Sequence, residues 1–182
     1  MKHTATMALM VTLGVAGVYA QQIPVQMTFS GDGTPSVIDL KQPNTNTGEE
    51  NVAGDGTQGP FTFRLVKASA ASPQPSSTCS GPTKLYFPNM AGAGLFRFQD
   101  GSLLKVNLME GGDCIDFAAN EAHCTLTFQV AGGTGRFQDA SGVLTLTETA
   151  TPLLGDASNN PVFFTETGEF TGTISTGGNS KP

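Results

Sequence analysis

The sequence predicts an all-β protein: a closed antiparallel barrel of about eight strands with two long loops. Glycine is abundant, with 23 residues among 182, and tryptophan is absent. No long segment has the apolar period of a helix, whereas short runs alternate apolar and polar residues and end at glycine-rich turns. Many short strands in one domain favour a sandwich or a barrel. A sheet with a single apolar side favours the barrel, because closure removes exposed strand edges.

The chain begins with a segment typical of a secretory signal peptide. Lys2 precedes a short apolar run that ends in Val18-Tyr19-Ala20, so residues 1–20 are expected to be removed on export. The run is too short to span a bilayer well, and an uncleaved anchor is the alternative. Residues 21–174 are then one barrel domain, and residues 175–182 a frayed polar tail. We therefore expect a secreted, extracellular or periplasmic protein.

The remaining chain is acidic. It has 8 basic and 15 acidic residues, a net charge of −7. Such a surface repels phosphate backbones, so nucleic acid is not an expected partner. No basic amphipathic helix is present, so no membrane contact is expected after cleavage.

Two strands are predicted ahead of the first long loop, at Val25–Ser30 and Ser36–Leu40. Lys41–Pro60 is polar and rich in Asn, Gly and Thr, which indicates a loop. Its acidic residues do not have the spacing of an EF-hand, so a solvated loop is the preferred interpretation over a calcium site.

The next strand, Phe61–Lys67, alternates apolar Phe61, Phe63 and Leu65 with other residues, as a half-buried strand does. Ala68–Pro82 is the second long loop. Later strands are separated by short turns, among them the hairpin signal Asp100-Gly101. They are predicted at Lys84–Phe87, Gly94–Gln99, Ser102–Met109, Asp113–Phe117, Ala122–Val130, Gly142–Ala150 and Val162–Ile174.

Three cysteines, Cys79, Cys114 and Cys124, are expected to be oxidised after export. Cys114 and Cys124 enclose a plausible hairpin connection, which predicts a Cys114–Cys124 disulfide and leaves Cys79 over. Pairing of Cys79 with one of the other two is the alternative. No metal site is predicted, because the mature chain has one histidine and no close cysteine pair.

The stretch Gly132-Gly133-Thr134-Gly135-Arg136-Phe137 is the most distinctive motif. A dinucleotide site would need a third glycine where Gln138 stands, and a helix to follow. A strand-like segment follows instead, so we interpret the motif as a tight strand junction. Phe137 is expected to plug a barrel end, and Arg136 to cap carbonyls or pair with an acid such as Asp139.

The run from Phe128 to Gly142, with its Gly-Gly-Thr-Gly-x-Phe and Ala-x-Gly elements, resembles the hairpin of allene oxide cyclase-like and dirigent-like barrels. Phe96–Leu104 and Glu169–Ile174 are also similar to secreted microbial members of that group. The resemblance implies an eight-stranded barrel, often trimeric, with an apolar cavity and no cofactor. Its plant members guide cyclisation or coupling of reactive small molecules. The first strand here has no carboxylate, so no catalytic residue is carried over.

Few residues suggest chemistry by themselves. His123 lies on a threonine-rich strand face, which favours a surface position over a general base. Glu166 and Glu169 are three residues apart on one strand and therefore point to opposite faces. Glu148 shares the face of Leu144 and Leu146 and is the acid most open to an inward position, although a solvated strand end is the preferred interpretation.

Three arginines lie on or near strands: Arg64, Arg97 and Arg136. Two of them at one cavity mouth could hold an acidic ligand, but pairing or solvation on the polar face is preferred.

Three functions are compatible with these patterns, and whether the protein is an enzyme is left open. The first is binding of a small apolar molecule in the barrel. The second is a cofactor-independent cyclase or isomerase of the allene oxide cyclase-like type, and the third an extracellular structural or interaction module with a filled core. The predicted barrel lining consists of Phe63, Leu104, Val106, Leu126, Phe128 and Leu144.

Overall fold

The structure is a computed structural model that describes residues 21–79, 84–158 and 160–176. The predicted signal peptide, residues 1–20, lies outside the described residues, as do residues 177–182 of the predicted tail. Ser175 and Thr176, also expected in the tail, belong to the last strand and pair with Gln22 and Gln21.

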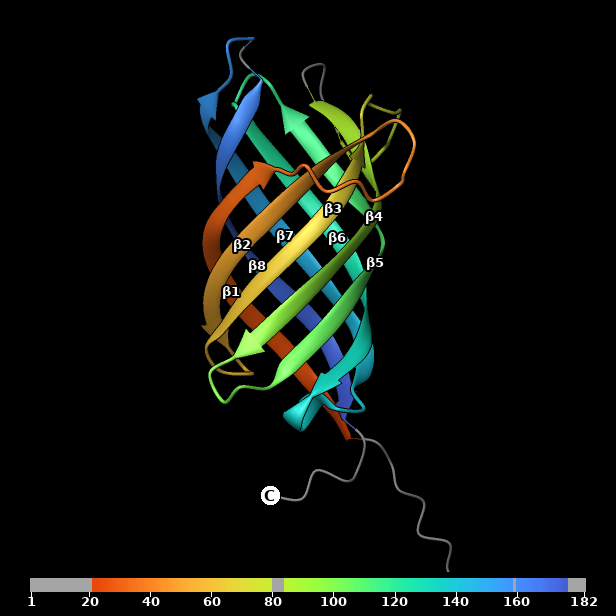
Figure 1. Ribbon diagram of the computed structural model, residues 1–182, viewed down its shortest axis with the longest axis vertical. Coiled ribbons are helices and arrows are strands. Elements are labelled where there is room, and N and C mark those ends of the chain that lie inside the picture. Colours follow the sequence, from red (N-terminus) through yellow and green to blue (C-terminus); the bar gives the residue numbers. More distant parts are fainter. Residues whose placement is uncertain (1–20, 80–83, 159, 177–182) are drawn as a thin grey trace, which may run out of the picture.

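Eight antiparallel strands form one closed barrel, in which every strand pairs with its neighbours in the sequence and the last pairs with the first (Figure 1). This confirms the predicted fold class. The strands are β1 (Gln21–Pro35), β2 (Thr45–Gly56), β3 (Phe61–Ala70), β4 (Lys84–Phe98), β5 (Leu103–Asp116), β6 (Glu121–Thr134), β7 (Ser141–Gly155) and β8 (Pro161–Thr176).

One of the two predicted long loops is wrong. Most of Lys41–Pro60 is strand β2, whereas Ser36–Leu40, predicted as a strand, lies in the connection before it. The inner face of β2 carries Glu50, Val52 and Gly54, so apolar alternation is missing even though the backbone pairs on both sides. Of the second predicted loop, residues 68–70 belong to β3 and residues 80–82 lie outside the described residues. The loop is confirmed in residues 71–79, which contain only an isolated bridge between Gln74 and Tyr86.

Several strands are longer than their apolar patterns indicate. The first strand is predicted at Val25–Ser30, but β1 runs from Gln21 to Pro35. The paired short strands predicted between Lys84 and Phe117 are two long strands, β4 and β5, and register shifts interrupt the β5–β6 ladder. At these shifts the ladder is irregular, which obscures the two-residue period in the sequence.

The two ends of the barrel differ. The connections after β1, β3, β5 and β7 lie at one end, which we call the open end. The connections after β2, β4 and β6 lie at the other, the closed end, together with Gln21 and Thr176. An antiparallel barrel must place successive connections at alternate ends, and here the two longest connections, after β1 and β3, both fall at the open end.

Aromatic side chains fill the barrel toward the closed end. Phe63 and Phe96 have ring centroids 4.3 Å apart, and Phe170 lies 4.9 Å from Phe63 and 4.8 Å from Phe96. All three are buried. Such packed rings contribute dispersion and quadrupole attraction beyond the burial of area. This half of the barrel is therefore a solid core.

The glycine stretch closes this end. Gly132 and Gly135 have φ angles of 74° and 59°, and a short 3-10 turn over Gly135–Phe137 joins β6 to β7. Phe137 is 1% exposed, with its ring centroid 4.8 Å from that of Phe98. The predicted strand junction and plug are confirmed. Arg136 donates to the Gln58 carbonyl at 2.5 Å, as a carbonyl cap does.

The acid paired with Arg136 is Asp100, at 3.2 Å, rather than Asp139. Asp100 belongs to the β4–β5 turn and Gln58 to the β2–β3 connection, so the arginine ties the three connections of the closed end together.

The predicted Cys114–Cys124 disulfide is wrong: the bridge joins Cys79 to Cys114, and Cys124 is a buried free thiol. In the β5–β6 register Cys114 lies opposite His123, and Cys124 lies opposite Asp113. Direct partners share a face and adjacent residues alternate, so Cys114 and Cys124 point to opposite sides of the sheet. The bridge instead fastens the 71–79 segment to β5.

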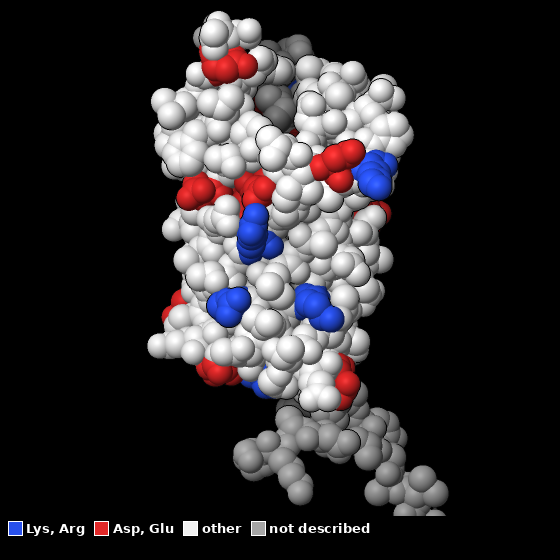
Figure 2. Space-filling model, viewed as in Figure 1, with Lys and Arg blue, Asp and Glu red and all other residues white. Residues whose placement is uncertain are grey.

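Among the described residues, no helix is long and apolar enough to cross a membrane. The face shown in Figure 2 is mostly uncharged, and the charged side chains on it are scattered, with no continuous basic patch among the described residues.

Candidate functional site

A cavity of about 930 Å³ occupies the open end of the barrel. Apolar side chains near its mouth come from the connection after β1 and from β8, namely Val37, Ile38, Val162 and Phe164. Deeper in the barrel its lining becomes polar and charged. Polar residues of the open-end connections, among them Asp39, Gln42 and Asn160, also border the cavity, so its entrance is mixed apolar and polar above a charged floor.

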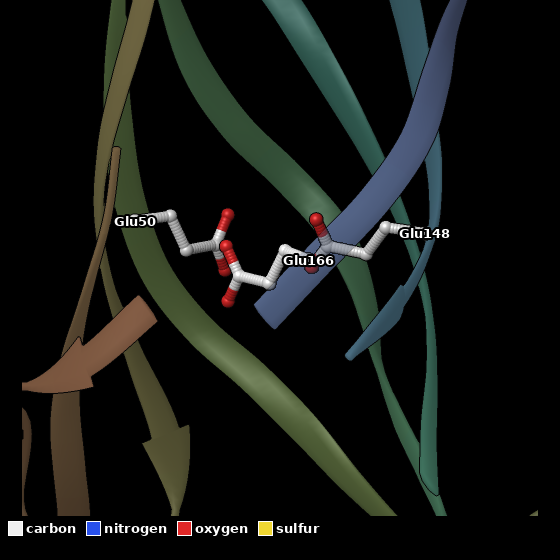
Figure 3. A group of neighbouring side chains, drawn as sticks. All are labelled: Glu50, Glu148 and Glu166. Carbon is white, nitrogen blue, oxygen red and sulfur yellow. The ribbon is translucent and has the colours of Figure 1, made fainter. Parts of the chain in front are cut away.

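Five ionisable side chains make up this floor, and we call them the ionic cluster. They come from five different strands and consist of Glu50 of β2, Lys67 of β3, Asp113 of β5, Glu148 of β7 and Glu166 of β8. The three glutamates are buried, with 3%, 6% and 5% exposure in that order (Figure 3). The cluster lies between the aromatic core and the open space of the cavity.

Lys67 is the centre of the cluster. Its Nζ atom lies 2.6 Å from Glu50 Oε1, 3.2 Å from Asp113 Oδ1 and 3.7 Å from Glu148 Oε1. It also approaches the sulfur of Cys124 at 3.6 Å. One ammonium group therefore faces several carboxyl groups in a part of the barrel with little access to water.

Neighbouring amides and hydroxyls extend this network. Asn89 donates its Nδ2 to Asp113 Oδ2 at 3.1 Å, and Ser69 donates to Asn89 Oδ1 at 2.7 Å. Hydrogen bonds to the ionised form hold a carboxylate in that form. Although burial acts to raise the pKa of Asp113, the Lys67 charge and these hydrogen bonds keep it below its usual range.

The pKa values of three other buried groups are raised, whereas that of Asp113 is lowered. Burial, followed by the charge of Glu50, raises the pKa of Glu148 to about 8. Burial and the charges of Glu50 and Glu148 raise the pKa of Glu166 to about 9. Burial also raises the pKa of the Cys124 thiol well above its usual range. Two carboxyl groups in the cluster therefore hold protons near neutral pH.

Lys67 stays charged at neutral pH. Burial by itself would lower its pKa, but Asp113, Cys124, Glu50 and Glu148 together raise the pKa well above 10.5. The ammonium is the fixed positive charge about which the acids are arranged.

Strand register explains why these residues meet. Lys67 continues the inward series Phe61, Phe63 and Leu65 on β3, and Glu148 follows Leu144 and Leu146 on β7. The two-residue period of a strand carries each series from the apolar core into the cavity.

A glycine on β1 makes room for one acid. A Cβ atom added at Gly33 would lie 2.1 Å from Glu166 Oε1, so a side chain there would force that carboxyl group to move. The absence of a side chain at Gly33 is what lets Glu166 occupy its position in the floor.

The six predicted lining residues all point into the barrel, and each is at most 2% exposed. None of them borders the cavity, because they pack in the core below the ionic cluster. They are Phe63, Leu104, Val106, Leu126, Phe128 and Leu144.

Of the acidic candidates, Glu148 and Glu166 belong to the floor. A solvated strand end for Glu148 is wrong, because only 6% of the residue is exposed. Glu169 lies on the other face of β8 from Glu166, as predicted from their spacing. His123 is on the outside, with its Nδ1 3.2 Å from Thr149 Oγ1 and its Nε2 3.6 Å from Glu121 Oε2.

The arginines do not border the cavity. Arg64 pairs with Glu49 at 2.5 Å on the outer surface, Arg97 is exposed on β4, and Arg136 is at the closed end. An acidic ligand held by two arginines at the mouth therefore has no support in this arrangement.

Glu50, Lys67 and Asp113 were not singled out by the sequence. The inward position of Lys67 could have been predicted, because it lies on the same strand face as the apolar residues at every second position before it. That of Glu50 could not, because β2 lacks apolar alternation. Asp113 was obscured by the irregular β5–β6 register.

Comparison of the chain with protein-family models and with curated proteins finds no match in either set.

Proposed function

We propose that this chain is a secreted barrel protein that binds a small molecule in the open end of the barrel. The observation that carries the proposal is the 930 Å³ cavity, which ends on a buried ionic cluster. Pockets for small molecules are commonly of roughly 300–1,000 Å³ and combine apolar walls with a few fixed polar groups. This cavity has both properties.

The ligand we propose is amphiphilic rather than wholly apolar. Its apolar part would lie against Val37, Ile38 and Phe164 near the mouth, and its polar end would meet Lys67 and Glu148 at the floor. A wholly apolar molecule would leave the buried Oε2 atoms of Glu148 and Glu166 without a polar partner, which costs free energy.

Secretion and the proposed family have separate support. The N-terminal apolar run and the Cys79–Cys114 disulfide support export to an oxidising compartment. The closed eight-stranded barrel, with Gly132–Phe137 at a strand junction, supports the resemblance to the allene oxide cyclase-like and dirigent-like group.

Native mass spectrometry of the protein purified from its own host tests ligand binding. We expect a retained compound in the natural protein. Ala150 borders the cavity two residues beyond Glu148 on β7, so Ala150→Phe should obstruct the space and remove that compound. Ala53→Phe introduces the same ring on the outer face of β2 and should keep it. No retained compound, or equal retention by both variants, would contradict the proposal.

A cofactor-independent cyclase or isomerase is the second candidate. It is favoured by one observation: Lys67, Asp113 and Glu148, all of types used in general acid–base catalysis, border the cavity. Incubation of the retained compound with fresh protein distinguishes the two. An isomer of equal mass with a new chromatographic retention time indicates catalysis, and unchanged compound indicates binding alone.

The third alternative is an extracellular module with a filled core. In that case every preparation would lack a retained compound, and Ala150→Phe would have no effect on any interaction of the protein.

A further inference from the structure

The three buried glutamates of the ionic cluster converge on one point. Glu50, Glu148 and Glu166 come from β2, β7 and β8, and their carboxyl groups are directed toward one another in the barrel interior (Figure 3). One oxygen atom from each lies within 4.8 Å of the other two. Three separate strands therefore bring three oxygen donors together.

This spacing fits a single metal ion. Two oxygens bound to the same ion cannot be farther apart than twice the metal–oxygen distance. For Ca²⁺ this limit is about 4.6–5.2 Å, and for Mg²⁺ it is about 4.2 Å. The three oxygens lie within 4.8 Å of one another, inside the upper limit for Ca²⁺.

A second observation concerns hydrogen bonding rather than acidity. Glu148 Oε2 and Glu166 Oε2 are buried and have no hydrogen-bond partner. The Glu148 side chain is only 1% exposed, so water does not reach it from outside the barrel. Buried polar atoms normally have partners, and an exception calls for an explanation such as an ion.

Charge points in the same direction. Lys67 is the single cationic side chain of the cluster, which contains four acids, and it pairs with three of them. With all five groups ionised the cluster sums to −3, and a divalent cation that displaces the protons of Glu148 and Glu166 would reduce this to −1. Carboxylate oxygens are hard ligands that suit Ca²⁺ and Mn²⁺, whereas Zn²⁺ prefers nitrogen and sulfur.

We propose that Glu50, Glu148 and Glu166 bind one hard divalent cation, Ca²⁺ or Mn²⁺, at the floor of the cavity. Three protein ligands leave further coordination positions, which an oxygen of a molecule bound in the cavity or a water bound with the ion would fill. The site goes beyond the proposed function, because it can be tested without knowing the ligand of the cavity.

Calorimetric titration tests the site. Full-length mature protein is treated with a chelator, desalted, and titrated separately with CaCl₂, MnCl₂ and ZnCl₂. We expect one-to-one binding of Ca²⁺ or Mn²⁺. The double variant Glu148→Gln/Glu166→Gln keeps the side-chain shape but removes two anionic ligands, and should weaken binding at least tenfold. Glu169→Gln, on the outer face of β8, is the matched control and should bind as the natural protein does.

The position of the ion is tested on the natural protein, so the result does not depend on whether a variant folds. Crystals grown with MnCl₂ should give an anomalous scattering peak between the three glutamates. A peak elsewhere only, no binding of Ca²⁺ or Mn²⁺ at millimolar concentration, or binding of Zn²⁺ alone would overturn the proposal. Retention of an organic compound is measured independently by mass spectrometry, so failure of one proposal does not imply failure of the other.

Discussion

Lys67 Nζ lies 2.6 Å from Glu50 Oε1 inside the barrel, and the two side chains are only 12% and 4% exposed. They come from neighbouring strands, where Glu50 is the direct partner of Leu65 and Lys67 lies one inward position farther along. The pair therefore joins β2 to β3 at the level where the apolar core gives way to the cavity.

Replacing the lysine should be strongly destabilising. Lys67→Met removes the cation shared by Glu50 and Asp113, and breaking a buried ion pair from one side costs about 3–5 kcal/mol. We expect a loss of that order in the free energy of unfolding, measured with urea at pH 7. Lys105→Met, at an exposed position on β5, is the control and should change it by less than about 0.5 kcal/mol. Equal effects of the two substitutions would show that the buried pair has no special role.

Stability should fall as the pH rises from about 4.5 to 9. The folded-state pKa values of Glu148 and Glu166, about 8 and about 9, lie above the ordinary value of 4.5. Between pH 4.5 and these values the folded state holds protons that the unfolded chain has released. This contribution is complete below pH 4.5 and is lost as the pH approaches 9. Each such group lowers the free energy of unfolding by about 1.4 kcal/mol per pH unit within its window.

Asp113 acts in the opposite direction, because its pKa is lowered in the folded state. Its contribution is present above pH 3.8 and is lost on further acidification. The decline between pH 6 and 9 therefore belongs to the two glutamates. Urea unfolding in the presence of a chelator should show this decline for the natural protein and a much flatter profile for Glu148→Gln/Glu166→Gln. A natural profile as flat as that of the variant would refute the assignment.

Thiol labelling should identify one free cysteine. Unreduced protein unfolded in denaturant should react at Cys124 alone, since Cys79 and Cys114 are bridged. The bridge closes a sequence separation of 35 residues, for which loop-closure entropy gives about 4 kcal/mol of stabilisation. Cys79→Ala should lower the free energy of unfolding by up to this amount and expose a second reactive thiol, Cys114. Labelling of Cys79 in the natural protein would contradict the pairing.

The plug at the closed end should affect stability and leave the cavity alone. Phe137 packs on Phe98, and Phe137→Ala should cost about 3–5 kcal/mol in the free energy of unfolding. Phe137→Leu fills more of the space and should cost less. Both variants should retain any compound bound at the open end, because the aromatic core separates the two regions. Loss of the compound in folded Phe137→Leu would show that the ends are coupled.

The barrel could be predicted because its core strands carry ordinary apolar alternation. Phe61, Phe63 and Leu65 are one such series, and the Gly132–Phe137 junction is another local signal. Strand β2 could not be predicted, because its inner face bears an acid and glycines. These residues fit there only because of their contacts with other strands, which the local sequence does not reveal. Gly54, for example, approaches the backbone of β1 so closely that a Cβ atom would lie 1.9 Å from Thr28 O.

The candidate site was less predictable than the fold for a related reason. Its members lie on five strands, and nothing in the spacing of Glu50, Lys67 and Glu166 along the chain brings them together. Only barrel closure and strand register do so. Glu148 could be noticed because it lies on the same face of one strand as Leu144 and Leu146, which the local sequence reveals. The Cys79–Cys114 pairing, in contrast, depends on which face of β5 a distant segment covers.

The closing seam between β1 and β8 also bears on how the chain can be rearranged. Gln21 and Thr176 are direct partners at the closed end, so the two ends of the described barrel are already side by side. A short linker could join them, and new termini could be opened in the exposed turn at residues 117–120, on the opposite end. Such a circular permutant would keep all eight strands in order while moving any attached group from the plugged end to the mouth of the cavity.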